Sequence, residues 1–96
     1  MKYFHRTHLA PDEVLEGATR FFGSTLAPAG EEARRRQFAG TIGQITVTVQ
    51  AEGGHYTFVE ATTDQMGESR MDRNVKRFFV HLHRAEDPSH TLHASY

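Results

Sequence analysis

The chain has 96 residues, a formal net charge of −1 and no cysteine. This length fits one small domain, and the absence of cysteine excludes disulfide bonds, thiolate zinc sites and a thiol nucleophile. A hydrophobic content of 38% is that of a folded chain and not of a disordered one. Because no stretch has the length of a signal-peptide core or of a membrane span, we expect a cytoplasmic protein that does not contact membranes.

The first third of the chain predicts a strand followed by a helix. Residues 2–8 (KYFHRTH) predict a short strand, and Pro11 followed by two acidic residues is a typical helix start. Apolar residues keep helical spacing from Val14 to Leu26, so we expect the helix to continue until Pro28 interrupts it. Residues 31–36 (EEARRR) are then expected to form a charged linker.

The central third predicts a meander of three antiparallel strands. We place them at residues 35–40, 44–51 and 56–62, with a tight turn at 40–43 between the first two. Gly53-Gly54 suits a two-residue turn between the last two strands, because both central positions of such a turn take positive φ.

A two-residue turn would place Tyr56, Phe58 and Glu60 on the face of the sheet that the helices cover, and Arg36 on the same face. A carboxylate on a core face is paired, at the sheet edge or lining a cavity. Two interpretations follow: a pocket in which Glu60 accepts from a ligand hydroxyl, or a peripheral ion pair of Glu60 with Arg36. The candidate ligand-binding residues are Arg36, Tyr56, Phe58, Glu60 and Phe79.

Residues 69–84 (SRMDRNVKRFFVHLHR) predict an amphipathic helix that Ser69 caps. One stripe of this helix is apolar and should pack on the sheet; it contains Met71, Val75, Phe78, Phe79 and Leu82. A second stripe is basic and contains Arg70, Arg73, Arg77, His81 and Arg84.

The basic stripe has two interpretations. It is either an outer face that is solvated or contacts another subunit, with Glu68, Asp72 and Glu86 offsetting its charge, or a contact for an anion or a nucleic acid. We favour the first and do not expect nucleic acid as the partner, because the net charge of the chain is negative. The candidate anion-binding or partner-binding residues are Arg70, Arg73, Arg77 and Arg84.

The remaining features point to no known chemistry. The seven histidines do not converge at metal-ligand spacing, so we expect no metal site and no cofactor, and we assign no catalytic residue. Residues 87–96 are polar and contain Pro88, which indicates a mobile C-terminal tail after a single domain at residues 1–86.

Two stretches carry a resemblance to a known family: YFHRTHLAPDEVLEGATRFF, and GQITVTVQAEGGHYTFVEATTD with the long helix after it. The chain resembles a shortened member of the START/polyketide-cyclase superfamily, which has the helix-grip fold. The resemblance extends over residues 2–84. It implies a sheet that holds a long C-terminal helix and a site for a lipid, a polyketide or another apolar ligand, with cyclase activity in some members.

Residues 10–85, in the order helix, three-stranded meander and helix, also resemble a double-stranded-RNA-binding domain. That resemblance implies recognition of A-form RNA by its shape, with positive charge near the start of the last helix. Arg70, Arg73 and Arg77 would supply this charge.

We therefore expect a two-layer α+β domain in the order β-α-β-β-β-α, with both helices on one face of an antiparallel sheet. As function we expect a small non-enzymatic binding or interaction module. It should form a homodimer through the outer sheet face, where Val59 and Ala61 would lie with Thr46 and Thr48. A helix-grip protein that binds a small apolar ligand or acts like a cyclase is the first alternative, and an RNA-binding module is the second.

Overall fold

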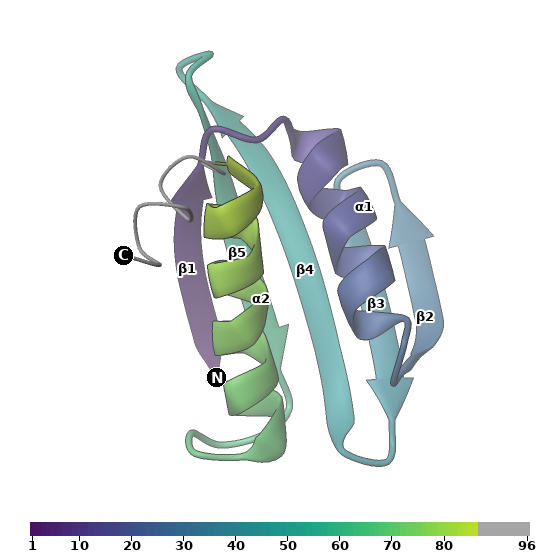
Figure 1. Cartoon of the computed structure of the whole chain (residues 1–96). Helices are drawn as coiled ribbons and strands as arrows, with labels where there is room; N and C mark the ends of the chain where they lie inside the picture. Colours follow the sequence, from purple (N-terminus) through teal and green to yellow (C-terminus); the bar gives the residue numbers. More distant parts are fainter. Residues whose placement is uncertain (87–96) are drawn as a thin grey trace.

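The computed structural model describes residues 1–86. Within this range, five strands and two helices follow each other along the chain (Figure 1). Their bounds are β1 (Lys2–Thr7), α1 (Pro11–Phe22), β2 (Ala27–Glu32), β3 (Arg35–Gly40), β4 (Gly43–Glu52), β5 (Tyr56–Thr63) and α2 (Arg70–Glu86). The tail predicted at residues 87–96 lies outside the described residues.

The strands form one antiparallel sheet in the order β1-β5-β4-β3-β2, and both helices lie on the same face of it (Figure 1). Helix α1 packs over β3 and β4, whereas α2 packs over β1, β4 and β5. The predicted two-layer α+β architecture is confirmed, with one strand more than expected. Neither of the described helices has the length and apolar composition that a membrane span requires.

One apolar core fills the space between the helices and the sheet. The Phe22 ring of α1 lies 5.1 Å from the Phe78 ring of α2 and 5.8 Å from the Phe38 ring of β3, measured between centroids. The apolar stripe of α2 faces this core as predicted. Its side chains at Met71, Val75, Phe78 and Leu82 are at most 1% exposed.

Helix α1 begins at Pro11 as predicted. The Glu13 carboxylate accepts a hydrogen bond from the backbone N–H of Ala10 at 3.0 Å, and proline at the first position has no N–H to leave unpaired. The helix ends at Phe22, earlier than the apolar spacing indicated. The backbone N–H of Leu26 donates to the Phe22 carbonyl at 2.8 Å, and this turn carries Leu26 into the core instead of along the helix.

The strand β2 was not predicted, because Pro28 and its neighbours are poor strand formers. At the edge of a sheet, however, a proline can direct its missing N–H position towards solvent. The segment predicted to be a linker forms the β2–β3 hairpin. Opposite charges meet across it, with Glu32 3.2 Å from Arg35 and Glu31 3.4 Å from Arg36.

The register of the first predicted hairpin, β3–β4, is correct, whereas the register of β4–β5 is wrong by one residue. Gly53 and Gly54 take positive φ angles of 59° and 75°, as expected. The loop has three residues and not two, because His55 belongs to it and Glu52 is opposite Tyr56. A slip of one residue moves every side chain of β5 to the other face.

As a result, Val59 and Ala61 are fully buried under the helices, and Tyr56, Phe58 and Glu60 face outward. The predicted face of all five residues is wrong. The physical reason is burial, since the shorter loop would bring a carboxylate into the core and expose two apolar side chains.

Helix α2 is tied to the sheet by a carboxylate in its first turn. Ser69 Oγ accepts from the backbone N–H of Asp72 at 3.0 Å, the cap that the sequence predicts. The Asp72 side chain is 6% exposed. Its carboxylate accepts a hydrogen bond from the Tyr3 hydroxyl of β1 and lies 3.1 Å from Lys76 Nζ. The bond to Asp72 raises the pKa of Tyr3 to about 12. The bonds from Tyr3 and Lys76 lower the pKa of Asp72 below its usual value.

Replacing Tyr3 with Phe should remove this bond and lower the melting temperature at neutral pH. Because the folded-state pKa of Tyr3 lies above its usual value of 10.0, the contribution is complete below that pH and is lost as the pH rises towards about 12. For Asp72 the folded-state pKa is lowered, so its contribution is lost as the pH falls below 3.8. Melting curves of wild type and Tyr3→Phe should therefore converge at both pH extremes.

The matched control for this series is Tyr56→Phe, which alters an exposed tyrosine of the outer sheet face. The melting curves of Tyr56→Phe and wild type should not converge in this way at the pH extremes. A Tyr3→Phe difference that stays constant from neutral pH to about 12 would contradict the assignment.

Candidate functional site

Three of the residues predicted to bind a small ligand lie on the outer face of the sheet. Tyr56, Phe58 and Glu60 face away from the helices, because the loop before them has three residues. The Phe58 ring stacks on Phe4 at 5.5 Å between centroids, and the Arg6 guanidinium lies 5.2 Å from the centroid of the Phe58 ring. These side chains form an aromatic patch on the sheet face that neither described helix covers.

The other two predicted ligand residues, Arg36 and Phe79, lie on the helix side of the sheet but at separate places. Arg36 is half-buried in the β2–β3 hairpin and pairs with Glu31, so the predicted ion pair with Glu60 does not form. Phe79 is half-buried and stacks on His5 of β1 at 5.0 Å between centroids. The five residues therefore build no common pocket.

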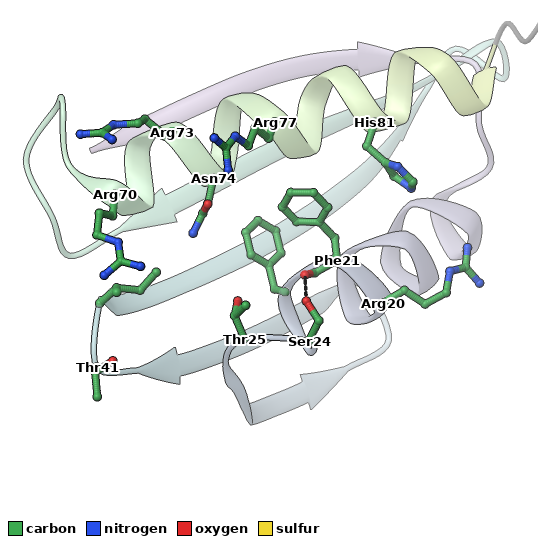
Figure 2. A pocket seen from close by; sticks show the side chains of 12 residues that line it. Arg20, Phe21, Ser24, Thr25, Thr41, Arg70, Arg73, Asn74, Arg77 and His81 are labelled. Carbon is green, nitrogen blue, oxygen red and sulfur yellow. Dashed lines mark hydrogen bonds between the residues drawn. The ribbon is translucent and has the colours of Figure 1, made fainter.

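The basic stripe of α2 is exposed, as predicted for an outer face, and it borders the gap between α2 and α1. Figure 2 shows Arg70, Arg77 and His81 along this side of α2, above a cleft that separates the two helices. The cleft has a volume of about 790 Å³.

The cleft has three walls. The end of α1 and the turn after it supply Arg20, Phe21 and Thr25, which are labelled in Figure 2. The β3–β4 turn supplies Thr41 and Ile42. Helix α2 is the third wall, with Arg70, Arg73, Asn74, Arg77 and His81. Arginines of both helices therefore border one cleft, and in Figure 2 the side chains of Arg70 and Arg77 lie along it whereas that of Arg73 points away from it.

A smaller hollow of about 460 Å³ continues the cleft towards the end of α2. Both are lined by Phe21, Arg77 and His81, and the smaller hollow adds Val80 and Arg84. All four arginines predicted as an anion-binding group thus lie along one depression between the helices.

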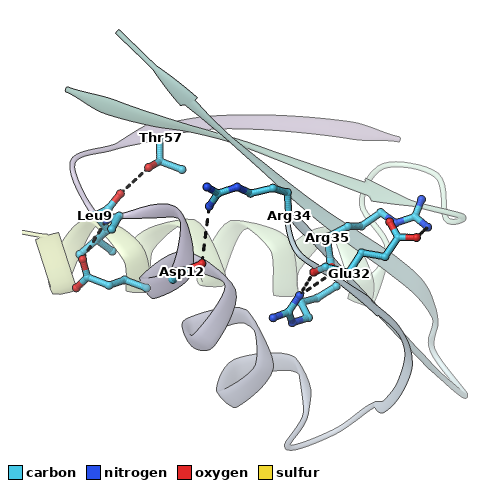
Figure 3. A network of polar contacts seen from close by, with 9 residues as sticks. Leu9, Asp12, Glu32, Arg34, Arg35 and Thr57 are labelled. Carbon is cyan, nitrogen blue, oxygen red and sulfur yellow. Dashed lines mark hydrogen bonds and ion pairs between the residues drawn. The ribbon is translucent and has the colours of Figure 1, made fainter. Parts of the chain in front are cut away.

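The arginines of this depression differ from the other arginines in their charge balance. Each of the other arginines has an acidic partner. Arg34 lies 3.7 Å from Asp12 and Arg35 lies 3.2 Å from Glu32, two pairs that can be followed in Figure 3. Two more such pairs are Arg6–Glu52 and Arg36–Glu31. Within residues 1–86, no ion pair is formed by Arg20, Arg70, Arg73, Arg77 or Arg84.

The acids that were expected to offset the stripe are placed elsewhere. Asp72 turns towards β1, as described above, and Glu86 accepts a hydrogen bond from the backbone N–H of His8. Glu68 forms no ion pair with any described residue. None of these three acids therefore forms an ion pair with an arginine of the stripe among the described residues.

Neutral polar groups complete the lining. Asn74 is half-buried, and its amide has no hydrogen-bond partner in the described part of the chain. The Ser24 hydroxyl donates to the carbonyl of Phe21 at 3.0 Å, which leaves its lone pairs to accept (Figure 2). Guanidinium groups form strong, paired hydrogen bonds with oxyanions. The arrangement can therefore bind an oxyanion and hold hydroxyl or amide groups beside it.

Sequence reasoning found the arginines of α2 and missed Arg20, Phe21 and Asn74. The helical period alone places Asn74 on the same stripe as its basic neighbours, so this residue was accessible to prediction. Nothing local marks the two residues of α1, since only the packing of Phe22 against Phe78 brings the end of α1 beside α2.

Comparison of the chain with models of protein families finds no match, and comparison with curated proteins finds none either. The function is therefore inferred from the geometry and charge of the cleft. Among residues 1–86, no three histidine, aspartate or glutamate side chains are grouped so that they could hold a metal ion.

Without a bound anion the stripe should destabilise the fold, because like charges one helical turn apart repel each other. Replacing Arg73 and Arg77 together by Gln should raise the melting temperature at low salt by about 1 to 4 °C, from roughly 0.3 to 0.5 kcal/mol in a domain of this size. The gain should shrink in about 1 M NaCl, where charges are screened beyond about 3 Å.

The matched control is Arg35→Gln, which breaks the ion pair with Glu32 and should not raise the melting temperature. If Arg73→Gln/Arg77→Gln melts at a lower temperature than wild type at low salt, the positive charge of the stripe is already compensated in the wild-type protein.

Proposed function

We propose that this protein is a non-enzymatic binding module that holds an anion with at least two charged groups in the cleft between α1 and α2. The observation that carries the proposal is that Arg20, Arg70, Arg73 and Arg77 border one cleft and form no ion pair with an acidic residue among residues 1–86. The volume of the cleft, about 790 Å³, lies within the range of small-molecule sites, which is roughly 300–1,000 Å³.

The lining favours binding over catalysis. In the described part of the chain it offers guanidinium, hydroxyl and amide groups and one imidazole, but no carboxylate. The imidazole of His81 lies 6.0 Å from the Phe21 ring, measured between centroids, so it stands beside an apolar surface. These groups suit recognition of charge and shape, and they offer no nucleophile with an adjacent base.

Titration calorimetry with inorganic tripolyphosphate tests the proposal. Three charge-assisted contacts of about 1.5 kcal/mol each should give a dissociation constant below about 1 mM at low salt. Arg73→Gln/Arg77→Gln should weaken binding about tenfold or more, because two of these contacts are lost. Arg35→Gln removes the same charge from a paired position on the sheet and should leave the affinity unchanged.

Equal affinities of wild type and the double variant would place the anion outside the cleft. Titration with duplex RNA tests the RNA-binding alternative in parallel. Tighter binding of the duplex than of tripolyphosphate, falling with about the −3 power of salt concentration, would favour that alternative.

The alternative of an apolar ligand under the long helix has less support. The helix-grip resemblance places such a ligand between the C-terminal helix and the sheet. In this chain that space is filled by Met71, Val75, Phe78 and Leu82, which are at most 1% exposed. The open depression lies between the two helices instead, and its lining is largely basic.

A second candidate function is self-association through the outer sheet face. No described helix covers this face, and Phe4 is 56% exposed there although it stacks on Phe58. Lys2 and Glu60 lie on the same face, on neighbouring strands, and neither forms an ion pair among the described residues. A two-fold axis over the aromatic patch can bring the carboxylate of one copy to the ammonium group of the other.

Sedimentation at tens of micromolar should then give a mass of about twice the 10.9 kDa of one chain. Phe4→Glu should return the monomer, because it places charge at the centre of the patch. Met66→Glu, at a position that is 84% exposed outside the sheet, should remain dimeric. A wild-type mass of one chain would reject the homodimer.

A further inference from the structure

The cleft has a charged part and an apolar part, and this division bears on the kind of anion that it fits. Arg70, Arg73 and Arg77 lie on the first two turns of α2, and the side chains of Arg70 and Arg77 extend along the cleft in Figure 2. With about 1.5 Å of rise per residue, the first and last of them are about 10 Å apart along the helix. Phe21, labelled in Figure 2, and Ile42 supply apolar surface in the same cleft.

The Phe21 ring is held in place from behind. Its centroid lies 5.0 Å from that of Phe22 and 5.6 Å from that of Phe78, and both of these rings are buried in the core. Phe21 itself is half-buried and lines the cleft. A fixed aromatic ring at the edge of a cleft provides a surface on which a flat ligand group can stack.

The cleft also offers uncharged hydrogen-bonding groups. Asn74 stands between Arg73 and Arg77 in the sequence, and its amide has no hydrogen-bond partner among residues 1–86. It lines the cleft with Thr25 and Thr41 (Figure 2). An amide and two hydroxyls suit the hydroxyl groups of a sugar or the polar edge of a heterocycle.

From this arrangement we infer that the ligand is a nucleotide or a compound built like one, with two or three linked phosphates on a flat ring system. The phosphates would lie against the guanidinium groups of α2, and the ring would stack on Phe21. This inference rests on the proposed function, since it names the chemical class of the anion bound in the same cleft.

Calorimetry with ATP and inorganic tripolyphosphate separates the two proposals. Both carry three linked phosphates, and only ATP has a ring and a sugar. ATP should bind wild type about tenfold more tightly, the gain expected from one stacked base. Phe21→Leu should abolish that preference and leave tripolyphosphate binding unchanged. Phe4→Leu changes a ring on the outer sheet face and should keep the preference.

A second measurement needs no variant. In saturation-transfer NMR with wild-type protein, the adenine protons of ATP should receive more saturation than the ribose protons, because the ring is the group in contact with Phe21. Saturation confined to the ribose would overturn the inference.

The remaining outcomes distinguish a failure of the nucleotide inference from a failure of the proposed function. Equal affinity for ATP and tripolyphosphate overturns the nucleotide inference and leaves the proposed function standing. Absence of binding to either compound overturns both. Binding of a single-stranded RNA oligomer more than tenfold tighter than ATP, about the gain of one further stacked base, overturns the inference in favour of a nucleic-acid site.

Discussion

The contact of three phenylalanine rings between the helices and the sheet is the constraint on which the rest of the structure depends. Phe22 from α1, Phe38 from β3 and Phe78 from α2 are each at most 2% exposed. Burying them together sets both helices side by side on one sheet face. Consecutive helical residues point about 100° apart, so the burial of Phe22 leaves Phe21 at the edge of the gap between the helices. The same reasoning applies to α2, where the basic stripe lies next to the buried one.

The positive charge of the cleft results from where the acids are placed and not from an excess of basic residues. The chain has 12 acidic and 11 basic side chains, so its overall charge is nearly balanced. The hairpin and sheet arginines have acidic partners. Asp72 lies in the sequence among the arginines of α2, yet its carboxylate binds Tyr3 on the opposite flank of the helix. One hydrogen bond thus ties the helix to β1 and leaves its other flank without a compensating charge.

The two faces of the sheet serve different purposes in this arrangement. The inner face carries the helices and so positions the cleft. The outer face carries polar side chains and the stacked pair of Phe4 and Phe58, which the Arg6 guanidinium partly covers. Polar outer faces are ordinary for antiparallel sheets, and an exposed aromatic pair is the feature that departs from this pattern. The proposed ligand site and the proposed contact between copies therefore lie on opposite sides of one sheet.

The local sequence pattern determined those elements in which a clear periodic pattern of side chains extends over many residues. The apolar period of α2, its cap at Ser69, the start of α1 at Pro11 and the register of β3–β4 were all predicted correctly. Tertiary structure decided what depends on partners distant in the sequence. The edge strand β2 forms because β3 offers it a partner, and the β4–β5 register slips by one residue because the core accepts Val59 and excludes Glu60. The sequence likewise determined that the arginines of α2 share one flank, but only the packing of α1 decided that this flank lines a cleft.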